Sequence, residues 1–567
     1  MKKALSCLLA LCLLLALGTA AADGVSGVFE GEAQGFHAPV KVQVTLEDGK
    51  IAKVDVVEHH ETDGVSDWSI SGTPARIIEA QSWNVDAVTG ATFSSNAVKY
   101  AVKAAIDKSG AEGLGEKVAQ AQPDDEEITV DVAVVGGGIA GLSAAIEAKE
   151  AGASVIVFEK LGRLGGSSVT SGGYVYGTGS QMNKDYDDDP EDIVNYYIMR
   201  GHNNIDVDLV RYWAEHSGES VDWLIDHIGL QFASVVPTGI SPAQRSHLTD
   251  NGGTGIMKPF YPKVEEAGIE VRLETPVVDL IVEDGKVSGL IAEKNGAKIT
   301  VHANAVVVAC GGFDASKEMK ALYAPDAENV GCMSSCGNTG DEIAWGEKLD
   351  ASMVFKGGVM GMHSTNPAYT LTGGINLLSF IPTLGVTSYG VRYHDESEDY
   401  PLYYTHMLES GSDVCYAIFD TTSGMADLCE AALPHFGYKA DTLEGLAEAA
   451  GIPVNTFLAT VKRYNSIAET GVDPYFRRQG VTPISEEGPY YAIKVVRATV
   501  AAFGGFEINE KAEVLDQQGN PIPALYAAGE CASGQFFDKE YPCSGSMLSI
   551  STTFGRIAGQ NAAAFGK

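Results

Sequence analysis

The sequence predicts an α/β protein whose main domain is built on a parallel sheet, preceded by a small α+β domain. Two observations lead to this prediction. Residues 132–135 are apolar and run into a glycine-rich turn and a helix start, and a second apolar strand follows at 153–158. Nearer the N-terminus, two strands at 40–45 and 51–57 flank a short turn. Strands that alternate with helices are typical of parallel sheets, whereas strand–turn–strand patterns are typical of antiparallel hairpins.

The glycine-rich turn, DVAVVGGGIAG, is typical of a dinucleotide site. Gly136, Gly138 and Gly141 allow the backbone to turn sharply, approach a pyrophosphate and pack helix on strand. The N–H groups and dipole at the helix start attract the anion. The second strand ends at Glu159, an acid placed to accept a hydrogen bond from a ribose hydroxyl. A Rossmann-like dinucleotide-binding domain is therefore predicted.

Composition limits the classes of function. The chain has 567 residues, enough for about three domains, and a formal net charge of −36, which argues against nucleic acid as a partner. Seven cysteines follow the first 22 residues, but no CxxC or CxxCH pattern occurs. Neither a metal site nor covalent haem is predicted. Cys332 and Cys336 are close enough in sequence to pair, and a reducing environment explains them equally well.

Residues 1–22 have the pattern of an export signal. Lys2 and Lys3 precede an apolar stretch at 8–17, which is followed by small residues. The apolar stretch is short for a membrane span. We expect an exported protein that works outside the cytoplasmic membrane, at the cell surface or in the periplasm.

The N-terminal domain is expected at 24–110, with a linker at 111–127. Near its end stands Asp86-Ala-Val-Thr-Gly-Ala-Thr92, followed by a predicted helix at 96–108. This motif resembles that of the FMN-binding domain of membrane redox complexes and secreted flavoproteins. The resemblance implies covalent FMN, coupled by a flavin transferase as a phosphoester on Thr92, and a membrane-associated electron donor. The alternative is a helix cap rich in serine and threonine.

Several later segments continue the dinucleotide pattern. Glycine pairs occur at 165–166 and 172–173, a strand at 305–309 enters another glycine pair, a further strand ends at Glu530, and a final helix is expected at 546–565. Together these segments resemble the FAD-binding domain of the fumarate reductase and flavocytochrome c superfamily, which includes urocanate reductases and 3-ketosteroid dehydrogenases. Besides the residues named above, the resemblance implies that non-covalent FAD is bound by Ala140, Lys160, Gly166, Ser167, Ser168, Gly172, Gly173, Val278, Asp341, Met547 and Leu548.

The resemblance also implies the domain order. The FAD-binding domain is expected in two parts, 128–345 and 502–567, separated by an α+β cap at 346–501 that closes over the substrate. Helical patterns at 441–450 and 454–468 support a separate cap.

The residues of the cap do not fit fumarate reduction. Fumarate reductases hold a dicarboxylate with arginines and protonate it with another arginine. In the matching segment of this chain, the proton-donating position is Tyr400, and the carboxylate-clamping position falls near Pro542. The relay positions fall near Asn376 and Ser379, and a substrate histidine position falls near Ala501. His363 aligns only loosely with another substrate histidine.

The 3-ketosteroid dehydrogenases offer a better match. Their catalytic tyrosine segment resembles Glu396-Ser-x-x-Tyr400, and their Y-x-x-x-G ending resembles Tyr541 to Gly545. The resemblance implies that Tyr400 transfers a proton while Tyr541 and the Gly545 N–H polarise a substrate carbonyl. Each tyrosine is also an ordinary residue for a cap interface. Arg245 and His247 are a further candidate pair for an anion or for catalysis, with a structural role as the alternative.

We therefore predict an exported two-flavin reductase, an FAD-dependent enzyme acting on CH–CH bonds. Electrons pass from FMN to FAD and leave as hydride to the activated C=C of a small, uncharged, enone-like or aromatic acceptor, with Tyr400 as proton donor. One alternative is a reductase of an unsaturated carboxylate of the urocanate, acrylate or fumarate type. The other is a non-enzymatic electron carrier.

Overall fold

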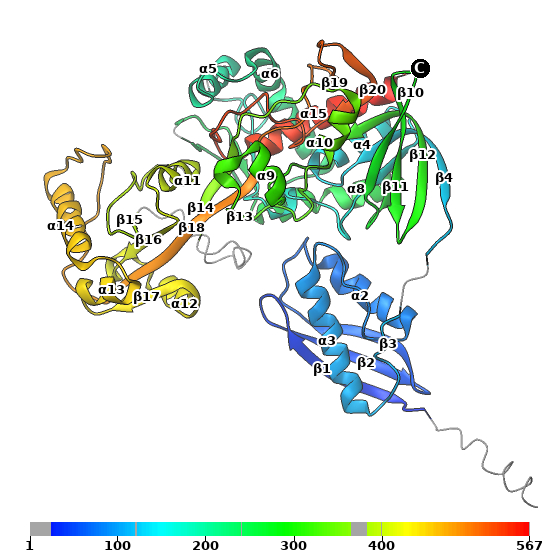
Figure 1. The fold of residues 1–567 in the computed structure, drawn as a ribbon, viewed down its shortest axis with the longest axis horizontal. Coiled ribbons are helices and arrows are strands. Elements are labelled where there is room, and N and C mark those ends of the chain that lie inside the picture. The colour runs from blue at the N-terminus through cyan, green and yellow to red at the C-terminus, as the bar shows by residue number, and fades with distance from the viewer. Residues whose placement is uncertain are drawn as a thin grey trace, which may run out of the picture. The chain divides into compact units, whose positions relative to one another are not determined.

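The computed structural model describes residues 24–118, 122–186, 188–239, 241–364, 383–398 and 400–565. The chain divides into two compact units, Met1–Ala121 and Gln122–Lys567 (Figure 1). The expected export segment lies outside the described residues, as do Asn376 and Ser379. Within the described ranges, no helix is both long and apolar enough to cross a membrane.

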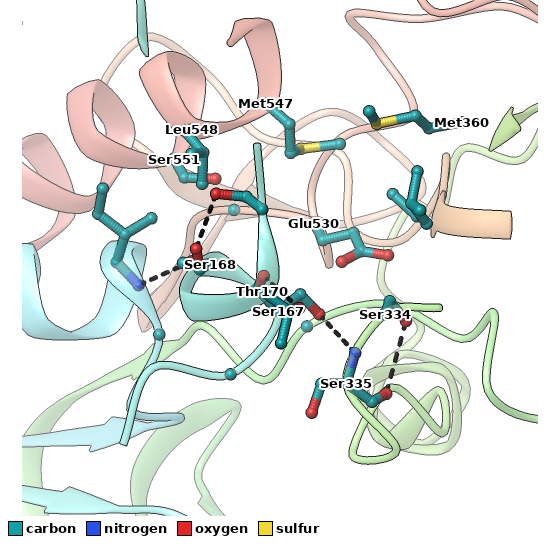
Figure 2. A pocket seen from close by; sticks show the side chains of 18 of the residues that line it. Ser167, Ser168, Thr170, Ser334, Ser335, Met360, Glu530, Met547, Leu548 and Ser551 are labelled. Carbon is teal, nitrogen blue, oxygen red and sulfur yellow. Dashed lines mark hydrogen bonds between the residues drawn. The ribbon is translucent and has the colours of Figure 1, made fainter. Parts of the chain in front are cut away.

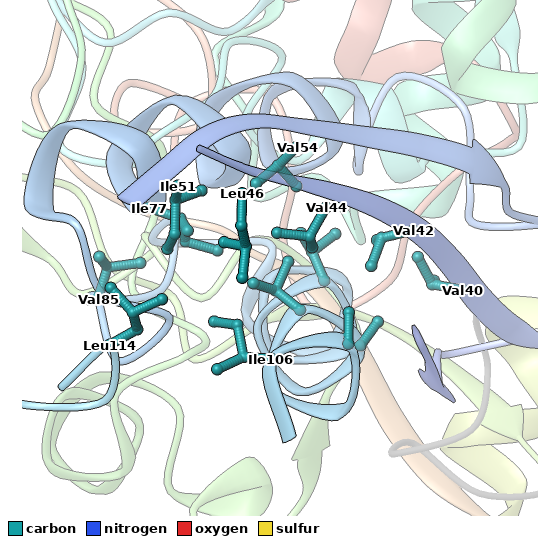
Figure 3. Packing of buried hydrophobic residues seen from close by; sticks show 14 of the residues in the cluster. Val40, Val42, Val44, Leu46, Ile51, Val54, Ile77, Val85, Ile106 and Leu114 are labelled. Carbon is teal, nitrogen blue, oxygen red and sulfur yellow. The ribbon is translucent and has the colours of Figure 1, made fainter. Parts of the chain in front are cut away.

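The first unit is an antiparallel sheet covered by two helices. Its strands β1 (Gly27–Gln34), β2 (Pro39–Glu47) and β3 (Lys50–Glu58) pair in sequence order, and its helices are α2 (Asp67–Ala80) and α3 (Thr92–Ser109). Every second residue of β2 is buried, from Val40 to Leu46, and packs toward the helices (Figure 3). This alternation is the period of a half-buried strand, and it confirms the predicted α+β class.

Two boundaries in the last third of the first unit differ from the predictions. Helix α3 begins at Thr92 rather than near residue 96. The first turn of this helix contains serines, which are weak helix formers. One of them, Ser95, is held by a side-chain hydrogen bond, in which its Oγ accepts from the Val88 N–H at 3.0 Å. The expected linker is also structured at its start, since Leu114 packs in the core and accepts from the Trp83 N–H at 3.0 Å.

The second unit contains the predicted parallel sheet. β4 (Glu126–Val135) lies between β12 (Ala297–Val308) and β5 (Val155–Phe158), parallel to both. β9 (Glu270–Arg272) extends one edge, and β10 (Val277–Glu283) and β11 (Lys286–Lys294) extend the other. β20 (Pro521–Ala527) pairs in parallel with β12 and carries β19 (Glu513–Leu515). The C-terminal segment thus completes the sheet begun at β4.

Helices α4 (Ile139–Glu150) and α15 (Ser546–Ala564) pack so closely that the backbone of one lies against the backbone of the other. A Cβ atom on Gly559 would lie 2.2 Å from the Ala144 carbonyl oxygen, and one on Gly555 would lie 2.5 Å from that of Ala140. Both distances are below van der Waals contact, so only glycine permits this approach. The contact joins the first helix of the nucleotide fold to the last helix of the chain.

The cap has its own sheet. Strands β13 (Gly331–Cys332), β18 (Tyr490–Ala502), β16 (Val414–Phe419) and β15 (Leu384–Thr387) are neighbours, and β14 (Val359–Ser364) and β17 (Gly437–Ala440) also pair with β18. Its helices are α11 (Tyr400–Glu409), α12 (Ala426–Phe436), α13 (Leu443–Ala450) and α14 (Val454–Thr470). Helices therefore occupy both segments whose periodicity suggested them.

The expected cap boundary at residue 346 falls inside helix α10 (Asp341–Leu349). Lys348 on this helix bonds Asp279 of β10 at 2.6 Å, and Met353 forms an isolated β-bridge with Phe506. Helix α10 is therefore tied to the parallel sheet of the second unit rather than to the cap. The remaining elements of the second unit are β6 (Tyr174–Tyr176), α5 (Pro190–Arg200), α6 (Val207–Trp223), β7 (Ser234–Val236), β8 (Ser246–Leu248), α7 (Gly252–Met257), α8 (Phe260–Glu266) and α9 (Lys317–Tyr323).

The substitution Gly559→Ala tests the helix contact. We expect it to lower the free energy of unfolding by about 1–3 kcal/mol, because the added methyl group must displace backbone. Gly72→Ala in α2 is the matched control, since its Cβ would meet nothing within 4 Å. We expect this control to be neutral or to stabilise by up to about 1 kcal/mol. Urea unfolding of both variants measures the difference, and equal effects would contradict the packing argument.

Candidate active site

A cavity of about 810 Å³ opens at the carboxyl ends of the parallel strands. Its lining includes the residues that directly follow β4, β5 and β12, and Gly529 and Glu530 beyond β20. This edge is where ligands bind in open α/β sheets. The same cavity reaches α11 of the cap and the start of α15, so one space joins a nucleotide region to a second region beneath the cap.

The turn between β4 and α4 is shaped by close backbone contacts. Gly136 has φ +107°, and a Cβ there would lie 2.2 Å from the Ala309 carbonyl oxygen. Gly138 precedes α4 without a side-chain cap, although Ser168 Oγ accepts from the Ile139 N–H at 3.3 Å. The first turn of α4 therefore presents backbone donors to the cavity, as an anion site requires.

Glu159 holds the neighbouring loops together. Its carboxylate accepts from the Gly137 and Leu161 N–H groups, each at 2.8 Å, and burial raises its pKa. Each oxygen keeps a further lone pair, so the side chain can still accept from a ribose hydroxyl. Beside it, Lys160 pairs with Asp341 at 2.7 Å.

Glu530 and the serines form the opposite part of the nucleotide region (Figure 2). Glu530 accepts from the Ala502 N–H and from Asn338 Nδ2, each at 2.9 Å, and burial raises its pKa well above the usual value. Ser167 Oγ accepts from the Ser335 N–H at 3.1 Å. These bonds place polar groups from distant segments around one space. A glycine cradle with polar groups of this kind fits a flavin dinucleotide.

Most cofactor residues predicted from the sequence line this cavity. They are Gly136, Gly138, Ala140, Glu159, Lys160, Gly166, Ser167, Ser168, Gly172, Asp341, Glu530, Met547 and Leu548.

Three of the residues predicted to bind FAD do not line the cavity. Gly141 and Gly173 serve backbone packing, since a Cβ on Gly141 would lie 2.0 Å from the Gly136 carbonyl oxygen and one on Gly173 would lie 2.5 Å from Gly252 Cα. Val278 is 44% exposed, and its neighbour Val277 lines the cavity instead. Successive side chains of a strand point to opposite faces, so a shift of one residue reverses the assignment.

Sequence reasoning missed Asn338, Met333 and Ser335 in the lining. They follow the glycine pair at 311–312, which was the available signal for a further cofactor loop.

The three predicted catalytic residues lie on this same cavity. Tyr400 is the first residue of α11 and is 8% exposed. The Tyr541 hydroxyl oxygen accepts from the Met547 N–H at 2.8 Å. Gly545 precedes α15 with φ +95°, and within the described chain its N–H donates to no protein acceptor. A phenol and a backbone donor thus lie at the second region of the cavity.

Buried ion pairs hold the segment that leads to Tyr400. Glu396 bonds both Arg392 and Arg478 at 2.6 Å, and Arg392 also bonds Asp473 at 2.7 Å. Two arginines and two carboxylates balance one another, which offsets the cost of burying charge. These arginines therefore position the cap, and neither of them lines the cavity.

The second region of the cavity is apolar and aromatic. Its lining includes Met360, Met362, Tyr174, Val500 and Ala501. No arginine or histidine occurs among the described lining residues, and the single cation is Lys160 beside Glu159. Glu398 adds a carboxylate near Tyr400, and it bonds His406 at 3.0 Å. The stretch 365–382, outside the described residues, contains no arginine, lysine or histidine in its sequence.

Three other candidates do not line the cavity. Arg245 forms an ion pair with Asp188, and His247 bonds Ser180 Oγ at 2.7 Å, while burial lowers the His247 pKa. His363 is buried against Tyr403 instead, with ring centroids 4.6 Å apart. The structural alternative for Arg245 and His247 is the one that their contacts support.

Thr92 lies in the first unit, exposed at the first residue of α3. The residue before it, Ala91, provides no side-chain cap, and Ser94 and Ser95 bond to groups outside the helix. The serine- and threonine-rich cap considered from the sequence is therefore not formed. The first-turn amides of α3 remain available for phosphate oxygens.

Comparisons with known proteins agree with both units. The FAD binding domain family matches residues 131–548, which is most of the chain. The chain belongs to this family. The FMN-binding domain family matches residues 35–107, so the chain is a flavoprotein with an FAD and an FMN domain.

Relatives of this FAD binding domain protein are named as reductases. The urocanate reductase of Eggerthella lenta is 32% identical over 574 residues, covering 96% of this chain and 93% of that protein. The NADH:acrylate oxidoreductase of Vibrio harveyi is 29% identical over 620 residues, covering 95% of this chain and 61% of that protein. The chain therefore spans less than two thirds of the second relative.

Solved structures resemble the second unit. The open conformation of a flavocytochrome c3 fumarate reductase is 29% identical, with a TM-score of 0.66 over 77% of this chain and 78% of that one. A 3-ketosteroid-Δ4-(5α)-dehydrogenase of Rhodococcus jostii, in complex with 4-androstene-3,17-dione, is 26% identical, with a TM-score of 0.65 over 78% of this chain and all of that one. The fold agrees with both enzyme types.

The buried carboxyl of Glu342, next to the cavity residue Asp341, provides a pH prediction. Burial raises the pKa of Glu342 to about 8, from the ordinary value of 4.5. Between these two values the folded protein keeps a proton that the unfolded chain releases. The free energy of unfolding is therefore highest below pH 4.5 and falls as the pH rises toward 8. We expect Glu342→Gln, which stays neutral, to gain on the order of 2 kcal/mol over the parent chain between pH 5 and pH 8.

Urea unfolding at both pH values measures this gain. Glu347→Gln, exposed on the same helix, should show none. A pH-independent difference for Glu342→Gln would show that its carboxyl is ionised in the folded protein.

Proposed function

We propose that this protein is an exported two-flavin reductase that transfers hydride to the activated C=C bond of an uncharged, enone-like or aromatic acceptor. The proposed electron route leads from a membrane-associated donor to FMN on Thr92 and then to FAD in the cavity. Reduced flavin supplies the hydride when bound, and the residues of the chain must supply the proton and hold the acceptor. The family and the names of its relatives support a reductase.

The lining of the second cavity region supports the acceptor class best. A carboxylate bound there would lose its hydrogen bonds to water and would gain no ion pair with an arginine. Burying an unpaired carboxylate costs free energy. Glu398, the carboxylate in this lining, is paired with His406 and provides no positive charge for such a ligand. Methionine and tyrosine side chains instead suit a flat apolar molecule.

The proposed roles follow from the positions of the polar groups. Tyr400 donates its hydroxyl proton to the carbon next to the one that receives hydride, so the C=C bond gains one hydride and one proton. Tyr541 and the Gly545 N–H hold the carbonyl oxygen, on which negative charge develops. The Met547 N–H bond to the Tyr541 oxygen favours this role, because a donor to that oxygen makes the hydroxyl a stronger donor.

An unsaturated carboxylate is the second candidate acceptor, and the 32% identity to a urocanate reductase favours it. In this chain, neutral donors would have to bind the carboxylate. A pure electron carrier is supported less, because the cavity extends beyond the nucleotide region to Tyr400 and Tyr541.

An acceptor screen tests the proposal. Purified full-length protein is given a reduced viologen dye and either 3-ketosteroids, vinylphenols and other enones, or urocanate, acrylate and fumarate. We expect dye oxidation with members of the uncharged group. Oxidation by carboxylates alone would support the second candidate, and oxidation by no acceptor would support the carrier.

Tyr400→Phe tests the proton donor. We expect the rate of acceptor reduction to fall by about 100-fold or more, the usual contribution of a positioned acid, while flavin content stays unchanged. Tyr404→Phe on the same helix is the matched control, since Tyr404 is buried outside the cavity lining and should leave the rate near that of the parent. An unchanged rate in Tyr400→Phe would assign the proton to another group.

A further inference from the structure

An exposed aromatic side chain adjoins Thr92. Phe93 is 71% exposed, and no other phenylalanine in the described part of the chain is exposed. Burying such a ring is normally favourable by about 1.5–3 kcal/mol, so an uncovered phenylalanine next to a proposed attachment residue indicates a ligand surface.

A second ring continues this surface. Phe36 lies with its ring centroid 5.7 Å from that of Phe93, at an interplanar angle of 66°. His37 packs edge-on against Phe36 at 4.9 Å and bonds Thr62 Oγ1 through Nε2 at 3.0 Å. We call Phe36 and Phe93 the aromatic platform.

A buried carboxylate fixes the platform. Glu61 is 5% exposed; it accepts from the Phe36 N–H at 2.8 Å and from the Ser94 hydroxyl. One side chain therefore ties the loop that carries Phe36 to the helix turn that carries Phe93. Hydrogen bonds to a charged acceptor are stronger than neutral ones, so the relative position of the two rings is well determined.

We propose that the isoalloxazine ring of the FMN on Thr92 packs on the aromatic platform and that Glu61 is its positioning residue. This inference rests on the proposed attachment at Thr92. The phosphate would lie at the uncapped start of α3, where the first-turn N–H groups are available. The flexible ribityl chain then allows the flat, largely apolar ring to return onto Phe93, the residue next to its attachment point, and stacking on Phe93 removes both surfaces from water.

Fluorescence of the full-length, flavin-loaded protein tests this inference. Stacking on an aromatic ring quenches flavin emission, and the Thr92→Ala protein, which would retain only FAD, provides the background to subtract. We expect Phe93→Ala to increase the unstacked, emitting fraction of FMN by about two- to tenfold, which corresponds to the loss of one aromatic contact. In-gel fluorescence after denaturation, which reports covalent flavin, should equal that of the parent chain.

Two further variants complete the design. Tyr100→Ala removes another exposed aromatic ring from the same helix and should leave FMN emission unchanged. Glu61→Ala should raise emission as Phe93→Ala does, whereas Glu61→Gln keeps an acceptor for the Phe36 N–H and should restore most of the quenching.

The outcomes separate the two proposals. If the parent chain shows no in-gel fluorescence, or keeps it in Thr92→Ala, the attachment at Thr92 is wrong. If attachment holds but Phe93→Ala has the emission of the parent, the platform does not hold the flavin and the inference is overturned. Loss of covalent flavin in Phe93→Ala would assign the ring to recognition by the transferase and would also overturn the inference.

Discussion

The second unit depends on the close approach of backbones that only glycine allows. Side chains at Gly136 and Gly141 would collide with carbonyl oxygens at the β4–α4 turn, and side chains at Gly555 and Gly559 would separate α15 from α4. The turn sets where the first-turn amides of α4 point. The helix contact sets where Met547 and Leu548 at the start of α15 reach the cavity. Two segments far apart in the chain thus form the nucleotide region together, because glycine lets their backbones approach closely.

The buried arginines of the cap are committed to ion pairs and do not line the cavity. The chain is strongly acidic overall, yet the charges near Tyr400 are arranged in compensated groups, with Arg392 and Arg478 against Glu396 and Asp473. Because these arginines are occupied within the protein, the second cavity region is left to methionine, tyrosine and backbone donors. Arg392 and Glu396, in the segment that resembles that of fumarate reductases, therefore have a positioning role. The lack of an arginine among the described cavity-lining residues directs our proposal toward uncharged acceptors.

Much of the fold could be predicted because its signals are local. The apolar strand at 132–135, the helix after Gly138 and the alternation from Val40 to Leu46 all depend on neighbouring residues. Boundaries were less accurate. Helix α3 starts at Thr92 because the Ser94 hydroxyl bonds the distant Glu61 and holds its first turn, and Leu114 joins the first core through a contact with Trp83. Such contacts cannot be seen in a window of sequence.

The sequence by itself determined the two flavin domains, the glycine cradle and the presence of Tyr400 at the position where fumarate reductases carry a proton-donating arginine. Tertiary structure alone decided which residues reach the cavity. Val277 rather than Val278 lines it, because the side of the strand that faces the cavity depends on how the strand pairs in the folded sheet. Arg245 does not line it, and forms an ion pair with Asp188. It also brought Tyr400, Tyr541 and Gly545 to one space from distant segments. Residue types follow from the sequence, but their shared surroundings depend on packing between segments far apart along the chain.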